Sequence, residues 1–304
     1  MINKKSKNKI VEKDVAVVKV IAYVVLSVMS ILAIAPFVIL LSASFSSEAS
    51  LAKDGYGLFP TEFSTAAWEY LWQARGVIFK AYGLTIVVTA LGTVLSVFIS
   101  SMFAYGLIQR LKINKALMVM LVITMIFSGG MVSSYYVWAQ WFNIRNTFMA
   151  LVFPNLLTSA FTIILIMSYY KSSIPSELLE AARIDGAGEF RIYFNVILPL
   201  SVPILATVAL MQALLYWNNW TNGYYFIDGR HTDLYTIQHL LNQMNQEITF
   251  LQSNPNFQLQ AGTELPQSAV RMAIAFIGVL PIIVSFPFFQ KYFAKGLTLG
   301  GVKG

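Results

Sequence analysis

The segment of this chain whose residue types and spacing could do chemistry is the polar stretch 174–203, which separates two apolar runs. Pro175 and Glu177 suit the first turn of a helix, because proline presets the backbone angle and an acidic residue favours the positive end of the helix dipole. Gly186 suits the end of that helix, because glycine tolerates the left-handed backbone conformation. A short helix with small alanine side chains could dock in a groove of a partner protein. Composition alone fits an ordinary interfacial loop equally well.

No other segment offers a catalytic arrangement. The sequence contains no Walker A motif, nucleophile elbow, pair of catalytic carboxylates or metal-ligand spacing. It has no cysteine and two histidines, His231 and His239, which we interpret as ordinary loop residues. A thiolate metal site and a histidine cluster are therefore excluded. We expect no catalytic residue, metal site or cofactor in this chain, and its net charge of +7 forms no basic face of the kind that binds nucleic acid.

Composition indicates that much of this chain is surrounded by lipid. Of its 304 residues, 57% are hydrophobic and 12% are charged, and the mean hydropathy is +0.65. A helix needs about 20 apolar residues to cross a bilayer. The first apolar run is too long for a signal peptide and is interpreted as a retained span. The sequence predicts an all-α, polytopic membrane protein with six transmembrane helices, at residues 20–44, 82–108, 116–138, 148–170, 197–220 and 270–292.

The distribution of lysine and arginine predicts the orientation, because cytoplasmic loops carry an excess of both. Most of the 21 lysines and arginines fall on the side that also holds both termini. We therefore expect both termini in the cytoplasm, with a basic tail at 1–19, a transmembrane domain at 20–293 and a short tail at 294–304. The segment 174–203 is then cytoplasmic as well.

Two long loops, 45–81 and 221–269, are predicted to face the outside. The second is rich in asparagine and glutamine, a composition that low-complexity segments share. Leucine and isoleucine recur within it at helical spacing, which favours a short amphipathic helix packed on the outer surface.

The segment 174–203 resembles the EAA loop of ABC importer permeases. The family pattern is Glu-Ala-Ala, three residues, Gly, nine residues and then Ile-x-Leu-Pro, and the one departure here is Val196 in place of the first isoleucine. Asp185 and Ala187 complete the form typical of sugar permeases. The resemblance implies docking on an ATPase subunit, with a glutamate as polar anchor, two alanines for close packing and a glycine for the bend. Pro199 is expected to open the next span. The residues implied in coupling are Glu180, Ala181, Ala182, Asp185, Gly186, Ile197, Leu198 and Pro199.

The resemblance extends over most of the chain and is closest to the second permease of the maltose-type group, in its branch for complex oligosaccharides. Besides the EAA loop, it rests on GLFP at 57–60, FSGGM at 127–131 and the end of the chain from Pro287. It implies a type I ABC importer permease fold in the bacterial cell membrane and no enzyme activity. The implied partners are a homologous second permease, two ATPases that bind ATP and Mg, an extracellular solute-binding protein, an oligosaccharide and membrane lipid.

Two alternatives stay open at this point. The EAA loop does not set the substrate, so a permease for a peptide or a polyamine fits the same motif. A membrane-embedded enzyme such as a glycosyltransferase would need acid and base groups, and the predicted spans contain almost none.

Aromatic and amide residues gather after the third predicted span and at the end of the fifth, where a sugar could bind. Sugars have apolar ring faces that stack on aromatic side chains and hydroxyls that pair with amides. Tryptophan and tyrosine also collect at membrane interfaces whatever the function, whereas an amide is costly in lipid and is expected to face a cavity or another helix. The candidate contacts along the substrate path are Asn155, Tyr135, Tyr136, Tyr216, Trp217, Asn218 and Asn219.

Overall fold

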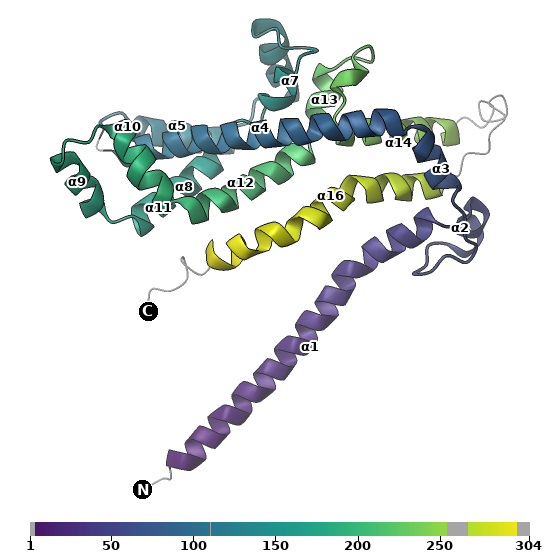
Figure 1. Ribbon diagram of the computed structural model, residues 1–304, viewed down its shortest axis with the longest axis horizontal. Helices are drawn as coiled ribbons and strands as arrows, with labels where there is room; N and C mark the ends of the chain where they lie inside the picture. Colours follow the sequence, from purple (N-terminus) through teal and green to yellow (C-terminus); the bar gives the residue numbers. More distant parts are fainter. Residues whose placement is uncertain (1–3, 110, 254–266, 297–304) are drawn as a thin grey trace. The chain divides into compact units, whose positions relative to one another are not determined.

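The computed structural model describes residues 4–109, 111–253 and 267–296, and every regular element within these ranges is a helix (Figure 1). The all-α prediction is therefore confirmed for the described residues. The elements up to residue 152 are α1 (Lys4–Ser44), α2 (Glu48–Asp54), α3 (Ala66–Gln73), α4 (Arg75–Ile108), α5 (Asn114–Ile126), α6 (Gly130–Tyr136), the π-helix η1 (Val137–Trp141) and α7 (Met149–Val152). The later elements are α8 (Ala160–Ser173), α9 (Ser176–Ile184), α10 (Glu189–Ile192), the π-helix η2 (Tyr193–Ile197), α11 (Leu198–Leu200), α12 (Val202–Trp217), α13 (Thr221–Phe226), the 3-10 helix η3 (Thr232–Leu234), α14 (Ile237–Ser253) and α16 (Gln267–Gly296).

Three of these helices, α1, α4 and α16, contain segments long and apolar enough to cross a membrane, and two bent pairs raise the possible spans among the described residues to five. The predicted count of six is thus not confirmed. The predicted span 148–170 is divided into α7 and α8, because Pro154 lies between them and Asn155 takes a positive φ of 59°. The predicted span 116–138 is bent by 119° after α5.

The chain divides into two compact units, which are described separately. The first unit contains α1, α2, α3 and the described residues of 248–277. Within it the ring of Phe45 stacks on the rings of Phe63 and Trp68, with centroids 5.6 and 5.2 Å apart. Helix α1 begins at Lys4, so the predicted basic tail is largely helical.

Glu48 of the first unit holds the start of α16. Its carboxylate accepts hydrogen bonds from the backbone N–H groups of Ser268 (3.0 Å) and Ala269 (3.4 Å) and from the Ser268 hydroxyl (2.6 Å). The first N–H groups of a helix have no partner within the helix, and the helix dipole favours negative charge there. Glu48 therefore caps α16 from a segment more than 200 residues earlier in the chain.

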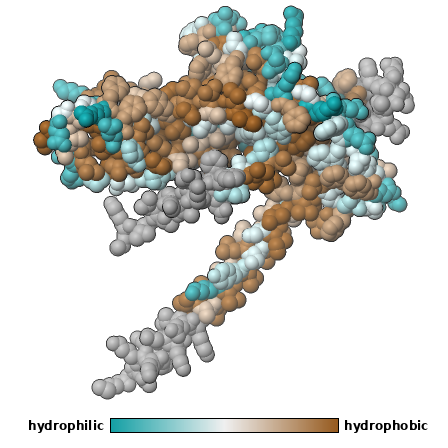
Figure 2. All heavy atoms as spheres, in the orientation of Figure 1, coloured by the Kyte–Doolittle hydropathy of each residue, from teal (hydrophilic) through white to brown (hydrophobic). Residues whose placement is uncertain are grey.

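The second unit is built on α4, which packs against α8 and α12. The contact with α12 is close because position 92 is glycine: a Cβ built on Gly92 would collide with the ring of Tyr216. Helices α9 and α10 lie at one end of α4, and α13 lies toward its other end (Figure 1). Figure 2 shows hydrophobic side chains along these helices and hydrophilic ones near α9 and α10 and near α7 and α13. This distribution suits helices whose flanks meet lipid.

The amphipathic helix predicted in the loop 221–269 is α14, and its existence is confirmed over Ile237–Ser253. Residues 254–266 of that loop lie outside the described residues. The hydroxyl of Thr85 in α4 accepts a hydrogen bond from the first N–H of α14 (2.7 Å). The apolar face follows the predicted spacing, with buried residues Ile237, Leu240, Leu241 and Met244.

Candidate functional site

The EAA-like segment forms helix α9 and the turn that ends it. Pro175 precedes the helix with φ −60° and ψ 131°, and Glu177 lies in its first turn. The chain then turns at Gly186, whose φ is +76°. The N–H of Ala187 donates to the carbonyl of Ala182 (3.0 Å) and closes the turn. The helix and the glycine bend that ends it therefore lie where the sequence predicts them.

Helix α9 has an inner and an outer face. Leu179 and Ala182 pack, partly buried, against the hydrophobic cluster at the base of the loop. On the outer face, Ala181 is exposed and Ile184 is 86% exposed. Just beyond the turn, Phe190 is 70% exposed. The two alanines of the motif thus differ: Ala182 lets the helix approach its own chain, and Ala181 leaves little side-chain bulk on the outer face.

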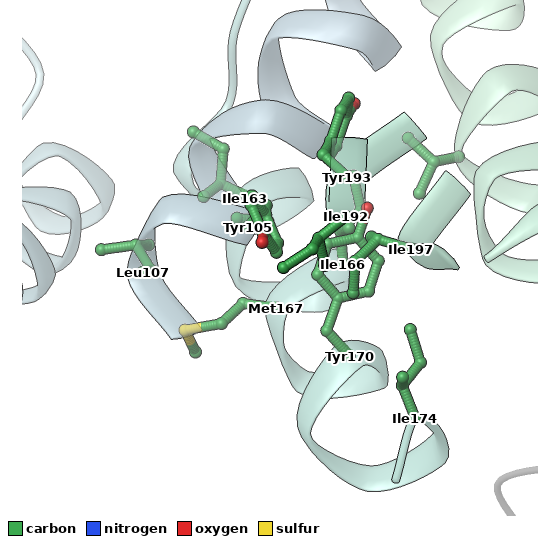
Figure 3. Close-up of a cluster of buried hydrophobic side chains, with 12 residues drawn as sticks. Tyr105, Leu107, Ile163, Ile166, Met167, Tyr170, Ile174, Ile192, Tyr193 and Ile197 are labelled. Carbon is green, nitrogen blue, oxygen red and sulfur yellow. The ribbon is translucent and has the colours of Figure 1, made fainter. Parts of the chain in front are cut away.

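A cluster of buried side chains from α4, α8 and the stretch 192–197 supports this turn (Figure 3). The hydroxyl of Ser101 in α4 lies 2.7 Å from that of Tyr170 and 2.8 Å from that of Tyr193, so hydrogen bonds cross the cluster between three elements. Ile197 of the motif is fully buried here, and Leu198 packs against the cluster. Its members are Ala104, Tyr105, Leu107, Ile163, Ile166, Met167, Tyr170, Ile174, Ile192, Tyr193, Ile197 and Val208.

The prediction that Pro199 opens the next membrane helix is wrong. Pro199 is exposed and lies in the short helix α11. Helix α12 begins at Val202 after a bend of 81°, and Pro203 occupies its first turn. Both prolines suit first turns, where their missing N–H groups cost no helical hydrogen bond. Sequence alone does not say which of the two starts the long helix.

A polar network that sequence reasoning missed ties the turn after α9 to α4. Glu189 accepts hydrogen bonds from the hydroxyl of Tyr105 (2.5 Å) and from Nε of Arg183 (3.1 Å). Arg183 also donates to the side-chain carbonyl of Gln109, and its hydrogen bond to Glu189 raises the pKa of Arg183. A groove of about 530 Å³ lies beside the network and is lined in part by Glu180. The only signal in the sequence is that Tyr105 and Gln109 are four residues apart and share a helix face.

The structure places Tyr216 and Trp217 in packed positions. The hydroxyl of Tyr216 donates to the carbonyl of Val152 (2.9 Å), and Nε1 of Trp217 donates to the carbonyl of Gly278 (3.2 Å). Both side chains are buried. Trp217 also lines an apolar groove of about 760 Å³ between α4, α12 and the part of α16 in the second unit.

Asn218 and Asn219 lie together at the rim of a hollow at the end of α12. The hollow has a volume of about 480 Å³. Asn218 is exposed, and its Nδ2 donates to the carbonyl of Leu214 (2.9 Å) within its own helix. Asn219 is half-buried and its Oδ1 accepts from the N–H of Asn222 (3.0 Å), which caps α13. The described residues that line it, none of them charged, are Leu156, Met211, Leu214, Leu215, Asn218, Asn219, Trp220 and Thr221.

The other candidate contacts do not line this hollow. Asn155 is exposed in the break between α7 and α8, and its Oδ1 accepts from the hydroxyl of Ser134 (3.1 Å). The half-buried ring of Tyr135 lies 5.4 Å from that of Phe226, and Tyr136 is exposed. Leu156, which follows Asn155 in the sequence, does line the hollow.

Asn222 is a buried polar residue that the sequence reasoning missed. Its Nδ2 donates to the carbonyl of Pro154 (3.0 Å). The break between α7 and α8 frees backbone carbonyls, and this amide satisfies one of them. Asn222 thus joins α13, beside the hollow, to the interrupted helix.

The two histidines differ in surroundings. His231 is a loop residue, as predicted, and its Nδ1 lies 2.6 Å from a carboxylate oxygen of Asp228; this hydrogen bond lowers the pKa of Asp228 to about 2. The same prediction is wrong for His239, which lies in α14 and is fully buried against Gly223 and the ring of Tyr235. Burial lowers the pKa of His239 to about 4. Among the described residues, no three His, Asp or Glu side chains gather to hold a metal.

Comparison with known proteins places this architecture among transport proteins. The sequence profile of the family described as "Binding-protein-dependent transport system inner membrane component" matches residues 16–299. The polygalacturonan/rhamnogalacturonan transport system permease protein YtcP of Bacillus subtilis is 33% identical over 93% of this chain and 96% of its own length. The melibiose/raffinose/stachyose import permease protein MelC of the same organism is 30% identical over 88% of this chain and 91% of its own.

A solved structure shares the fold. It is a bacterial ABC transporter involved in the import of the acidic polysaccharide alginate, and one of its chains is 25% identical with a TM-score of 0.75. The match covers 91% of this chain and 97% of that chain. The chain therefore belongs to the family of binding-protein-dependent transport system inner membrane components.

Proposed function

We propose that this chain forms one half of the translocation path of an ABC importer for an oligosaccharide, and that α9 couples this path to ATPase subunits. The single observation that carries the coupling role is the exposed outer face of α9 on a closely packed base. Figure 2 shows hydrophilic side chains near α9 and α10, and the apolar Ile184 and Phe190 are exposed. Burying one such side chain against a partner contributes about 1.5–3 kcal/mol.

The residues of the motif divide between docking and support. Glu180 and Ala181 are exposed and are assigned to contact with the ATPase, Glu180 as the polar anchor. Gly186 and Asp185 form the bend that presents this face. Ala182, Ile197 and Leu198 support the loop from within, and Pro199 belongs to the short helix that leads to α12.

In the proposed mechanism the chain switches access and catalyses no reaction. ATP, bound with Mg by two partner ATPases, closes those subunits together and carries the docked helices with them. This chain and a homologous second permease then rock between inward-facing and outward-facing states. An extracellular solute-binding protein delivers the solute, and both termini of this chain lie in the cytoplasm of a bacterial cell.

The relatives support an oligosaccharide as substrate, since those named above are permeases for polygalacturonan/rhamnogalacturonan and for melibiose/raffinose/stachyose, and the transporter of known structure is involved in alginate import. The hollow beside Asn218 and Asn219 fits this class, because it offers amides and an aromatic residue, Trp220. As its lining is uncharged, this half of the path would recognise hydroxyls rather than carboxylates. A peptide or polyamine permease is the alternative that the same fold allows.

The coupling role is tested in proteoliposomes that hold this chain with its second permease, ATPases and binding protein. Uptake of oligogalacturonides, raffinose, stachyose, a tripeptide and spermidine identifies the solute class. Gly186→Val forces a β-branched residue to a φ of +76°. We expect it to abolish both uptake and substrate-stimulated ATP hydrolysis.

Gly188→Val is the matched control, because Gly188 has an ordinary φ of −70° and open space around it. It should leave both activities near the wild-type level. Full uptake in an assembled Gly186→Val complex would show that the bend after α9 plays no part in coupling.

A further inference from the structure

One carboxylate joins the turn after α9 to the long helix α4. Oε2 of Glu189 accepts from the hydroxyl of Tyr105, and Oε1 accepts from Nε of Arg183 at the end of α9. Arg183 also donates to Gln109, which follows the last turn of α4. Tyr105, Glu189, Arg183 and Gln109 are thus joined in a chain of hydrogen bonds, which we name the clasp.

The strength of the clasp comes from its anchor in the core. The ion pair alone is a surface interaction, with 41% of the Arg183 side chain and 53% of the Glu189 side chain exposed, and such pairs contribute little. Tyr105 is only 7% exposed, however, and its ring lies 5.5 Å from that of Tyr193 within the cluster of Figure 3. The hydroxyl of a fixed ring therefore holds the carboxylate.

Few other contacts hold α9. None of its residues is fully buried, and its inner face touches the cluster through partly buried side chains such as Leu179 and Ala182. A force applied to the outer face of α9 could tilt the helix without moving α4 unless a second connection resisted the tilt. The clasp lies at the C-terminal end of α9 and supplies this second connection between α9 and α4.

Movement of α4 can reach α12, whose C-terminal end borders the hollow. Gly92 lies 13 residues before Tyr105 in the same helix, or about 20 Å along the axis. There α4 meets the ring of Tyr216, which is two residues before Asn218. A rigid helix with packed contacts at its middle and near its C-terminal end can carry displacement between those two places.

We propose that Glu189 is a positioning residue that makes α9 and α4 move as one body, so that ATP-driven movement of α9 reaches the substrate hollow. This inference rests on the proposed coupling role of α9. It assigns the transmission of movement to a clasp that lies largely outside the EAA motif, since Tyr105, Gln109 and Glu189 are not part of that pattern. Without the clasp, α9 still docks on the ATPase but moves without α4.

The test compares Tyr105→Phe, Glu189→Gln and the double variant in the reconstituted complex. Tyr105→Phe removes one hydroxyl and keeps the packed ring. Tyr169→Phe is the matched control, because among the described residues the Tyr169 hydroxyl has a single long contact, of 3.4 Å, with the carbonyl of Leu200. The measurements are the amount of assembled complex, the rate of ATP hydrolysis and the solute imported per ATP, with the panel solute that gives the highest wild-type uptake.

We expect both single variants to assemble and hydrolyse ATP while importing about fivefold less solute per ATP, the size expected for loss of one hydrogen bond. The double variant should be no worse than the singles, because both remove the same connection. Unchanged import per ATP in both single variants would overturn the proposal. So would failure of both to assemble, because the clasp would then serve folding. Failure of coupling by α9 itself would appear separately, as full uptake with Gly186→Val.

Discussion

The ring of Tyr216 lies where the side chain of any residue other than glycine at position 92 would have to be. This contact fixes the distance between α4 and α12, and α12 ends at the hollow beside Asn218. Gly92→Ala should force the helices apart or displace the ring, and overpacking of this kind costs about 1–3 kcal/mol. We expect a lower melting temperature of the purified complex in detergent. Gly83→Ala in the same helix is the control, because nothing lies within 4 Å of its added Cβ.

Glu48→Gln should weaken the start of α16. The substitution keeps the size of the side chain but removes the negative charge that accepts the N–H groups of Ser268 and Ala269. Loss of a charged cap costs about 1–2 kcal/mol. Hydrogen–deuterium exchange should be faster in the first turn of α16 in this variant and unchanged in Glu69→Gln, whose carboxylate accepts from the neighbouring hydroxyl of Thr65 (2.6 Å). Equal exchange in both variants would contradict the capping role.

Local patterns in the sequence were enough to predict α9, its glycine bend and the amphipathic helix α14. Each depends on residues close together in the chain: a proline, an acidic first turn and a glycine for α9, and apolar spacing for α14. The division of 148–170 was not predicted, because hydropathy averages over Pro154 and Asn155. The backbone carbonyl of Pro154, which lies in the break, is also paired with a residue far along the chain, because it accepts a hydrogen bond from the side-chain amide of Asn222.

The clasp and the burial of His239 could not be predicted for the same reason. Tyr105 and Glu189 are 84 positions apart, and only the packing of α4 against the turn after α9 brings them together. His239 belongs to the apolar face of α14, but the sequence does not show whether an imidazole on such a face is buried or exposed. The burial depends on the contact with Gly223, which is not visible in the local sequence.

The stability of the region around α14 should depend on pH through His239. Burial lowers its pKa to about 4, below the ordinary value of 6.5, so the unfolded chain binds the proton more readily between these values. Stability is therefore complete above pH 6.5 and falls as the pH drops toward 4, by at most about 2 kcal/mol at pH 5. Tyr235 is the titratable neighbour whose ring contacts the imidazole.

Thermal melting of the complex between pH 7.5 and 5 measures this effect. His239→Leu should reduce the slope of melting temperature against pH, whereas His231→Asn, at a half-exposed position, should leave it largely in place. An unchanged slope in His239→Leu would assign the pH dependence to other groups.

Asn218→Ala should weaken binding of the transported sugar within the path. The side chain is exposed at the hollow, and within the described part of the chain it donates to a carbonyl of its own helix, so its removal should change stability little. Loss of one hydrogen bond to a sugar hydroxyl raises the KM for uptake about fivefold. Asn195→Ala, an exposed asparagine in η2 near the opposite end of the unit, should leave KM unchanged. Equal values of KM in both variants would remove Asn218 from the substrate path.

Ile184→Ala and Ile192→Ala change the same residue type in opposite settings. Ile184 is 86% exposed on α9, and Ile192 is fully buried in the cluster beneath it. Truncation of a buried isoleucine costs about 2–5 kcal/mol, so Ile192→Ala should lower the melting temperature of the permease. Ile184→Ala should leave that temperature unchanged but weaken ATPase binding about tenfold, since burial of an apolar side chain of this size against a partner contributes about 1.5–3 kcal/mol.

Two measurements separate the effect on ATPase binding from the effect on stability. Co-purification of the ATPase at increasing concentrations of salt and detergent measures binding, and thermal melting of the permease alone measures stability. Exposed apolar side chains also occur on helix flanks that meet lipid. A substitution that weakens ATPase binding without changing the melting temperature identifies a docking residue rather than a lipid-facing one. If Ile184→Ala retained the ATPase as firmly as the wild type, the outer face of α9 would not be the docking face. The exposure of Ile184 would then have to be explained by another partner.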